Sequence, residues 1–219
     1  MHALVLCDDF YHPARVPRAG LAPLAERGEF RFEWIEHAGE WSAERMAAYP
    51  LVLLTKSNNV SAADRTPWAT PAVADAFCAY VRAGGGLLAI HSGTADYAGV
   101  PALRDLLGGV FARHPKQCPV TVTPRATHPL AAGSAPFTLV DEHYFMDMSD
   151  PGVEVFLTSS SEHGEQPAGW TRSEGAGRVA VLTPGHNLEV WLQPGYQSLI
   201  ANALRWCVRR DAAWSDPTP

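Results

Sequence analysis

Short apolar runs alternate with segments of helical periodicity along the first half of the chain. Four runs are typical of strands, and they lie at residues 2–7, 30–35, 51–54 and 87–90. Three segments repeat apolar side chains at helical spacing, at residues 19–27, 42–48 and 71–83. The apolar runs LVLL and LLAI suit strands that are covered on both faces of a sheet. Strands that alternate with helices in this way indicate parallel β-α-β units.

The second half of the chain is richer in strand patterns. Strands are predicted at residues 119–123, 137–140, 153–158 and 178–183. A helix is predicted from about residue 194 to 209, because Pro194 suits a first helical turn and apolar residues follow on one face. We therefore predict an α/β fold class, with a doubly wound, mainly parallel sheet and helices on both faces. One domain over residues 1–210 and a flexible tail over residues 211–219 account for the length.

Composition narrows the classes of protein. The chain has 219 residues, 47% of them hydrophobic, which is enough for one sizeable core. Its net charge of −6 gives no basic face for nucleic acid, so no nucleic-acid partner is expected. No apolar run reaches the roughly 20 residues that span a bilayer, so we expect no membrane contact. The four cysteines are far apart and lack CxxC spacing, which predicts reduced thiols in a cytoplasmic protein.

The stretch GGGLLAIHSGTADY, residues 84–97, carries the first chemical signal. It places His91 where a buried strand ends, and ligands of α/β sheets bind beyond the carboxyl ends of the strands. Small residues two positions either side, Ala89 and Gly93, allow a sharp turn centred on His91. The corresponding neighbours of Ser92 are β-branched, which disfavours a hydrolase serine. The elbow holds no cysteine, which disfavours glutamine amidotransfer.

Two later segments offer partners for His91. His186, in TPGHN, also follows an apolar strand, so it is expected at the same edge of the sheet. In DEHYF, an extended backbone would turn Glu142 and Tyr144 to one side and Asp141 and His143 to the other. On periodicity alone, either pair can line the site.

The remaining polar candidates are weaker. His114 and Gln117, in ARHPKQ, lie a short loop beyond a predicted helix at residues 100–107 and can reach the same crevice. His128 precedes a proline and is interpreted as a turn residue. The other histidines have no supporting context and are interpreted as surface or edge residues: His2, His12, His37 and His163.

Several motifs together resemble the ThuA-like, trehalose-utilisation family. They occur in order between residues 51 and 206: GGGLLAIHSG, ARHPKQ, THPLAAG, DEHYF, GRVAVLTPGH and NALRW. The resemblance implies the class I glutamine amidotransferase-like variant of the flavodoxin-like fold, with His91 at the elbow. It also favours Glu142 and Tyr144 as the pair that lines the site. Members are associated with sugar utilisation, often beside dehydrogenases that oxidise a sugar at its 3-hydroxyl.

Two chemistries follow for an oxidised (3-keto) sugar. His91, Glu142 and His186 make a three-ligand set for a divalent metal, zinc first, acting as a Lewis acid or on bound water. Alternatively, a histidine and a glutamate remove a proton beside the keto group, with Tyr144 donating a hydrogen bond to the enolate. Isomerisation, elimination and hydrolysis all remain open. Trp191 and Tyr97 are expected to stack on the sugar.

We therefore expect an enzyme that binds a small-molecule carbohydrate and needs no nucleotide cofactor. The alternative is a non-catalytic sugar-binding or regulatory module with the same fold. Homo-oligomer formation is left open.

Overall fold

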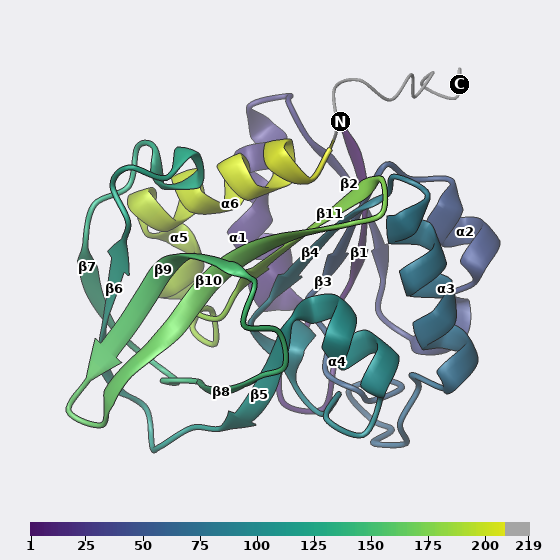
Figure 1. Ribbon diagram of the computed structural model, residues 1–219, viewed down its shortest axis with the longest axis horizontal. Coiled ribbons are helices and arrows are strands. Elements are labelled where there is room, and N and C mark those ends of the chain that lie inside the picture. Colours follow the sequence, from purple (N-terminus) through teal and green to yellow (C-terminus); the bar gives the residue numbers. More distant parts are fainter. Residues whose placement is uncertain (209–219) are drawn as a thin grey trace.

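The computed structural model describes residues 1–208, which form one layered α/β unit (Figure 1). The strands of its main sheet are β1 (His2–Leu6), β2 (Arg31–Ile35), β3 (Leu51–Leu54), β4 (Gly86–Ile90), β6 (Cys118–Pro124), β7 (Phe137–Asp141), β9 (Glu154–Ser161), β10 (Gly164–Glu174) and β11 (Gly177–Leu182). They form a nine-stranded sheet in the order β2-β1-β3-β4-β11-β10-β9-β6-β7. A separate pair of strands joins β5 (Gly109–Arg113) to β8 (Phe145–Met148).

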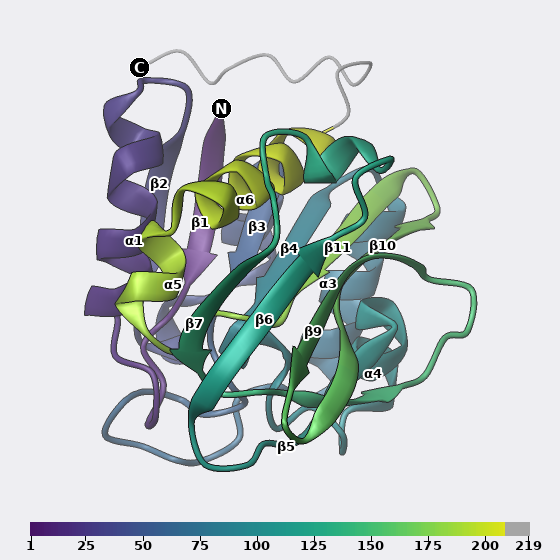
Figure 2. The ribbon, with the colours of Figure 1, turned by 90° about the vertical axis from the view of Figure 1, so that its left-hand side faces the viewer.

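Helices cover both faces of the sheet. They are α1 (Arg15–Glu26), α2 (Ala43–Ala47), α3 (Pro71–Arg82), α4 (Pro101–Leu107), α5 (Leu188–Leu192) and α6 (Pro194–Cys207). Figure 2 shows α1, α5 and α6 on one face, with α3 and α4 on the other. Alternate residues of β4 point to opposite faces of the sheet. Leu88 packs in the core between the sheet and α6, and Leu87 packs in the core between the sheet and α3. The sheet is therefore buried on both sides in its middle.

The parallel part of the sheet positions the site. Strands β2, β1, β3, β4 and β11 pair in parallel, so their carboxyl ends meet at one edge. Beyond β11 the pairings are antiparallel, and among the described strands of the main sheet β10 and β6 run against the direction of the others. The predicted fold class is confirmed, with a mixed sheet of mostly parallel strands.

Most predicted elements are present, and the differences have physical causes. No strand was predicted over β10. Its sequence lacks an alternating pattern, because Pro167 and Gly169 lie where its register with β9 shifts. Helix α1 begins at Arg15 instead of residue 19, since Pro17 suits a first turn. Strands β5 and β8 and helix α5 are too short to show a clear period. The predicted tail at residues 211–219 lies outside the described residues, as does residue 209 of the last predicted helix.

Within residues 1–208, no helix combines the length and apolarity that crossing a bilayer requires.

Candidate active site

His91 stands at a strained turn directly after β4. It opens the short 3-10 helix η2 (His91–Thr94), and its φ of 48° lies in the left-handed region that non-glycine residues rarely adopt. A Cβ on Gly93 would lie 2.7 Å from the carbonyl carbon of Leu54, and closer still to its oxygen, so only glycine fits there. The predicted elbow is confirmed: the close passage of two backbones turns His91 towards the strand ends.

The hydrogen bonds of His91 define its tautomer. Its Nδ1 lies 2.8 Å from the Thr183 carbonyl oxygen, which only accepts, so Nδ1 carries the proton. The Nε2 lone pair then faces Glu142 Oε2 at 3.4 Å. Burial lowers the pKa of His91, which favours the neutral ring. The Tyr144 ring stacks on the imidazole with centroids 4.1 Å apart, and so His91 is covered instead of open to solvent.

Glu142 is the centre of the cluster. Its Oε2 lies 3.1 Å from His186 Nδ1, and its Oε1 lies 3.6 Å from His114 Nε2. Burial raises the pKa of Glu142, but the adjacent His186 imidazole outweighs this and holds it well below its usual range. The same carboxylate raises the pKa of His186. Glu142 is therefore an ionised carboxylate at neutral pH.

Asp141, the residue before Glu142, is hydrogen-bonded to the backbone of the loop that carries His186. Its Oδ2 accepts the Gly185 N–H at 2.8 Å, and its Oδ1 accepts the N–H groups of His186 at 3.0 Å and Asn187 at 3.3 Å. Burial raises the pKa of this carboxyl despite those bonds. Asp141 thus fixes the loop after β11 that carries His186.

His12 is a member of the cluster that sequence reasoning missed. We interpreted it as a surface or edge residue, yet its ring centroid lies 4.9 Å from that of His91 and 5.1 Å from that of His186. One ligand atom from each of His12, His91, Glu142 and His186 falls within 4.8 Å of the others. The available signal was that His12 follows β1, whose carboxyl end meets the same edge of the sheet.

The chemistry of these donors fits a divalent cation. His12 Nε2, His91 Nε2 and His186 Nδ1 are buried without a hydrogen-bond partner among the described residues. They converge with an ionised carboxylate. With metal–ligand distances of about 2.0–2.1 Å, neighbouring ligand atoms are roughly 2.9 Å apart in an octahedral site and roughly 3.4 Å apart in a tetrahedral one. The separations of 3.4 Å and 3.1 Å from Glu142 Oε2 lie within that range.

A cavity of about 400 Å³ adjoins the cluster. Its lining combines aromatic rings with polar groups: Tyr11, His12, Ser57, Ala95, Asp96, Phe111, His114, Glu142, Tyr144 and His186. The ring faces of Tyr11, Phe111 and Tyr144 offer apolar surface, and the Phe111 and Tyr144 centroids are 4.3 Å apart. This volume accommodates a small ligand beside the cluster.

Three predicted substrate contacts lie elsewhere. Trp191 is 2% exposed and donates its indole N–H to the Gly185 carbonyl at 2.7 Å, so it supports the loop from the core. Tyr97 is fully buried, and its hydroxyl donates to the Lys56 carbonyl at 2.7 Å. The Gln117 carbonyl oxygen accepts from the Asn187 side chain at 3.0 Å, outside the cavity. His114 does line it.

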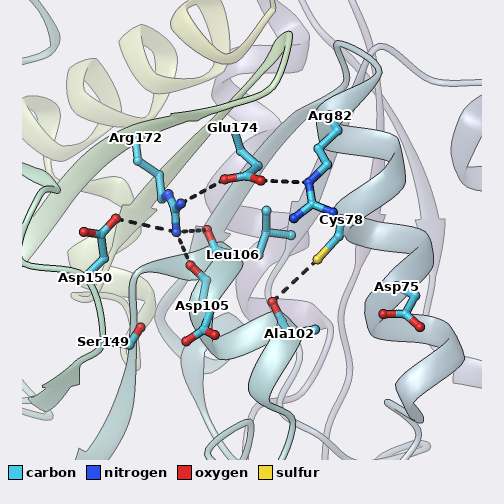
Figure 3. Close-up of a pocket in the computed structure, with 10 residues that line it drawn as sticks. All are labelled: Asp75, Cys78, Arg82, Ala102, Asp105, Leu106, Ser149, Asp150, Arg172 and Glu174. Atoms are coloured by element: carbon cyan, nitrogen blue, oxygen red, sulfur yellow. Dashed lines mark hydrogen bonds and ion pairs between the residues drawn. The ribbon is translucent and has the colours of Figure 1, made fainter.

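A larger cavity, of about 600 Å³, lies between α3, α4 and β10 (Figure 3). None of the described residues that line it is a histidine. Its charged groups bind each other: Glu174 lies 2.9 Å from Arg172 and 2.8 Å from Arg82. Arg172 also donates to the carbonyls of Asp105 and Leu106. This network ties the end of α4 to the sheet and leaves its arginines paired.

The comparisons with known proteins agree with this picture. The family profile described as ThuA, trehalose utilisation, matches residues 2–207. A ThuA-like protein from Bacteroides uniformis ATCC 8492 is 23% identical, with a TM-score of 0.71 over 97% of this chain and 93% of that one. A ThuA-like protein from Parabacteroides merdae ATCC 43184 is 16% identical, with a TM-score of 0.73 over 95% and 90%.

A protein from Salmonella typhimurium described as cytoplasmic is 14% identical, with a TM-score of 0.67 over 95% of this chain and 99% of that one. Identities at this level show the shared fold alone. Comparison with curated protein sequences gave no match.

Proposed function

The chain belongs to the ThuA, trehalose-utilisation family, and from that premise we propose that it is an enzyme of sugar utilisation. Its substrate is an oxidised (3-keto) sugar or glycoside, bound in the cavity beside His91, Glu142 and His186. One observation carries the proposal: unpartnered imidazole nitrogens and an ionised carboxylate converge at the strand ends, next to an aromatic-lined cavity.

The properties of Glu142 favour the metal-assisted chemistry over simple acid–base chemistry. An effective general base has a pKa near the working pH, whereas His186 holds the Glu142 pKa well below its usual range. The carboxylate is better suited to holding a cation with His91 and His186. A divalent metal, zinc or another, would supply Lewis-acid polarisation of the sugar carbonyl.

The other residues have roles towards the sugar. His114 Nδ1 lies 2.7 Å from the Pro115 carbonyl and so carries the proton, which leaves the Nε2 lone pair in the cavity. That atom is suited to accept a proton from the carbon next to a carbonyl. Burial raises the pKa of Tyr144 well above its ordinary value, so its hydroxyl stays protonated and can donate to the developing enolate oxygen. Tyr11 and Phe111 supply ring faces for the sugar.

A cytoplasmic location is part of the proposal. It is supported by the four free, buried cysteines and by the structural neighbour described as cytoplasmic.

The test combines metal analysis with proton exchange. Purified protein is expected to contain one divalent metal per chain and to exchange with deuterium the protons beside the carbonyl of a 3-keto glucoside. Chelation should abolish exchange and metal add-back should restore it. His91→Ala and His186→Ala should lose most of the metal, whereas His37→Ala, at an exposed histidine outside the cluster, should keep it.

Two results would contradict this assignment. Exchange at the wild-type rate by metal-free protein would establish the His/Glu acid–base alternative. Sugar binding with no exchange and no other turnover would establish the binding-module alternative.

A further inference from the structure

We propose that His12 is a fourth protein ligand of this metal site and that the buried Asp9 carboxylate is the positioning residue that holds it. The inference rests on the proposed function, because it takes the cluster of His91, Glu142 and His186 as a metal site.

The hydrogen bond to Asp9 sets the direction of the His12 ring. Asp9 Oδ1 lies 2.8 Å from His12 Nδ1, and an ionised carboxylate only accepts, so Nδ1 is the protonated nitrogen. The opposite atom, Nε2, then carries the lone pair. It is buried, has no hydrogen-bond partner among the described residues, and belongs to the group of ligand atoms within 4.8 Å of one another. A lone pair in that position is satisfied by a cation.

Several backbone N–H groups hold Asp9 in place. Its Oδ1 also accepts the N–H groups of Tyr11 at 2.9 Å and His12 at 3.0 Å, and its Oδ2 accepts the Ser57 N–H at 2.9 Å. Asp9 is 1% exposed, so these bonds hold it in a low-dielectric site. The carboxylate thereby joins the loop after β1 to the segment after β3. It also holds the His12 ring in a single orientation. Metal-binding histidines commonly donate their second ring N–H to a carboxylate in this way.

The ligand count has a consequence for the metal. Structural zinc sites close with four protein ligands, whereas catalytic sites keep a position open. With His12 included, an open position for a sugar oxygen requires a coordination number of five or six. The structure therefore points away from a closed tetrahedral zinc site and towards an ion that accepts a fifth or sixth ligand, such as Mn²⁺, Fe²⁺ or Co²⁺.

The test measures metal affinity and does not depend on turnover. Chelator-stripped full-length protein is titrated with Co²⁺, followed by its visible absorption spectrum, and with Zn²⁺ by calorimetry. Relative to wild type, His12→Ala and Asp9→Asn should each weaken binding by about 10- to 100-fold and alter the Co²⁺ spectrum. Exogenous imidazole should restore the spectrum of His12→Ala but not that of His91→Ala, whose site is enclosed. His163→Ala, an exposed histidine, is the matched control and should bind as wild type does.

The outcomes separate this inference from the proposed function. Unchanged affinity and spectrum in both His12→Ala and Asp9→Asn would overturn the inference and leave a three-ligand site intact. A wild-type protein that binds neither metal would overturn both. Circular dichroism of the metal-free variants checks folding. If Asp9→Asn does not fold, His12→Ala and His12→Gln decide the question, because His12 is at the edge of the cavity and not in the core.

Discussion

Replacing Gly93 by alanine tests the link between the elbow and the site. The backbone of Gly93 lies outside the left-handed region, so alanine is conformationally allowed there. What it lacks is space: the new Cβ would lie 2.7 Å from the Leu54 carbonyl carbon, closer than real Cβ atoms approach. The obstacle is backbone of the neighbouring strand β3, which cannot rotate away as a side chain can. The turn must therefore move as a unit.

The magnitude follows from two opposing effects. Overpacking that displaces backbone costs about 1–3 kcal/mol or more, while the entropy gain of Gly→Ala is only about 0.4–1 kcal/mol. The Ser92 hydroxyl, which donates to the Thr55 carbonyl at 2.8 Å, is strained by the same movement. We expect Gly93→Ala to lower the free energy of unfolding by about 2–3 kcal/mol. Displacing His91 should also weaken metal binding by about 10- to 100-fold, as the loss of a group that orients a metal ligand does.

The control is Gly99→Ala, since nothing lies within 4 Å of a Cβ built on Gly99 and its φ is not left-handed. Urea unfolding of the metal-free proteins gives the stability change, and a Co²⁺ titration gives the affinity. Gly99→Ala should match wild type in both within about 0.5 kcal/mol. If Gly93→Ala behaves like this control, the turn is not sterically determined and the reasoning from its small residues fails.

Four further predictions concern the cluster and its support. Asp141→Asn should lower the free energy of unfolding by about 2–4 kcal/mol and weaken metal binding, because it places an amide where the buried carboxylate accepts the N–H groups of the His186 loop. Urea unfolding measures the first effect, and a metal titration measures the second. Metal affinity should fall as pH decreases from 8 to 5, with protons competing first at His186, whose pKa is raised, and last at His91, whose pKa is lowered. Asp9 should contribute about 2 kcal/mol of stability above pH 3.8 that is lost as pH falls towards its folded-state pKa of about 2, so acid unfolding should be shallower in Asp9→Asn. Tyr144→Phe should slow proton exchange on the keto sugar while metal content stays at the wild-type level, and an unchanged exchange rate would exclude a role for its hydroxyl.

The parallel half of the fold could be predicted because its signals are local. Strands β3 and β4 are short, apolar and bounded by breakers, and the spacing of small residues around His91 reflects one close backbone contact. Strand β10 could not be predicted in the same way. It pairs with β9 through a shifted register at Pro167 and Gly169, so its hydrogen bonds depend on a partner that its own sequence does not indicate.

The aromatic contacts show a second limit. Trp191 and Tyr97 lie close in sequence to the motifs that carry the site, which is why they were expected to stack on a sugar. Nearness in sequence does not determine the direction of a side chain. In both residues the polar atom donates to a backbone carbonyl inside the protein, and this holds the ring in the core. The rings that do line the cavity include Tyr11, from a segment with no motif, and Phe111, directly before the motif ARHPKQ.

The DEHYF segment shows how far periodicity reaches. Strict alternation offered Glu142 with Tyr144, or Asp141 with His143, and the structure does bring Glu142 and Tyr144 to the cavity. The resemblance had favoured that pair, whereas β7 ends at Asp141, so the alternation that grouped the residues into pairs does not continue through the segment. His143 turns inward to the Ser161 hydroxyl at 2.8 Å, while Asp141 holds the loop of His186. The local pattern thus grouped Glu142 with Tyr144, which both line the cavity. The role of Asp141 depends instead on contact between the end of β7 and the loop after β11, whose residues are more than forty positions apart in the sequence. His12 was missed for the same reason: its role depends on Asp9, on the end of β3 and on a cluster assembled from four distant segments.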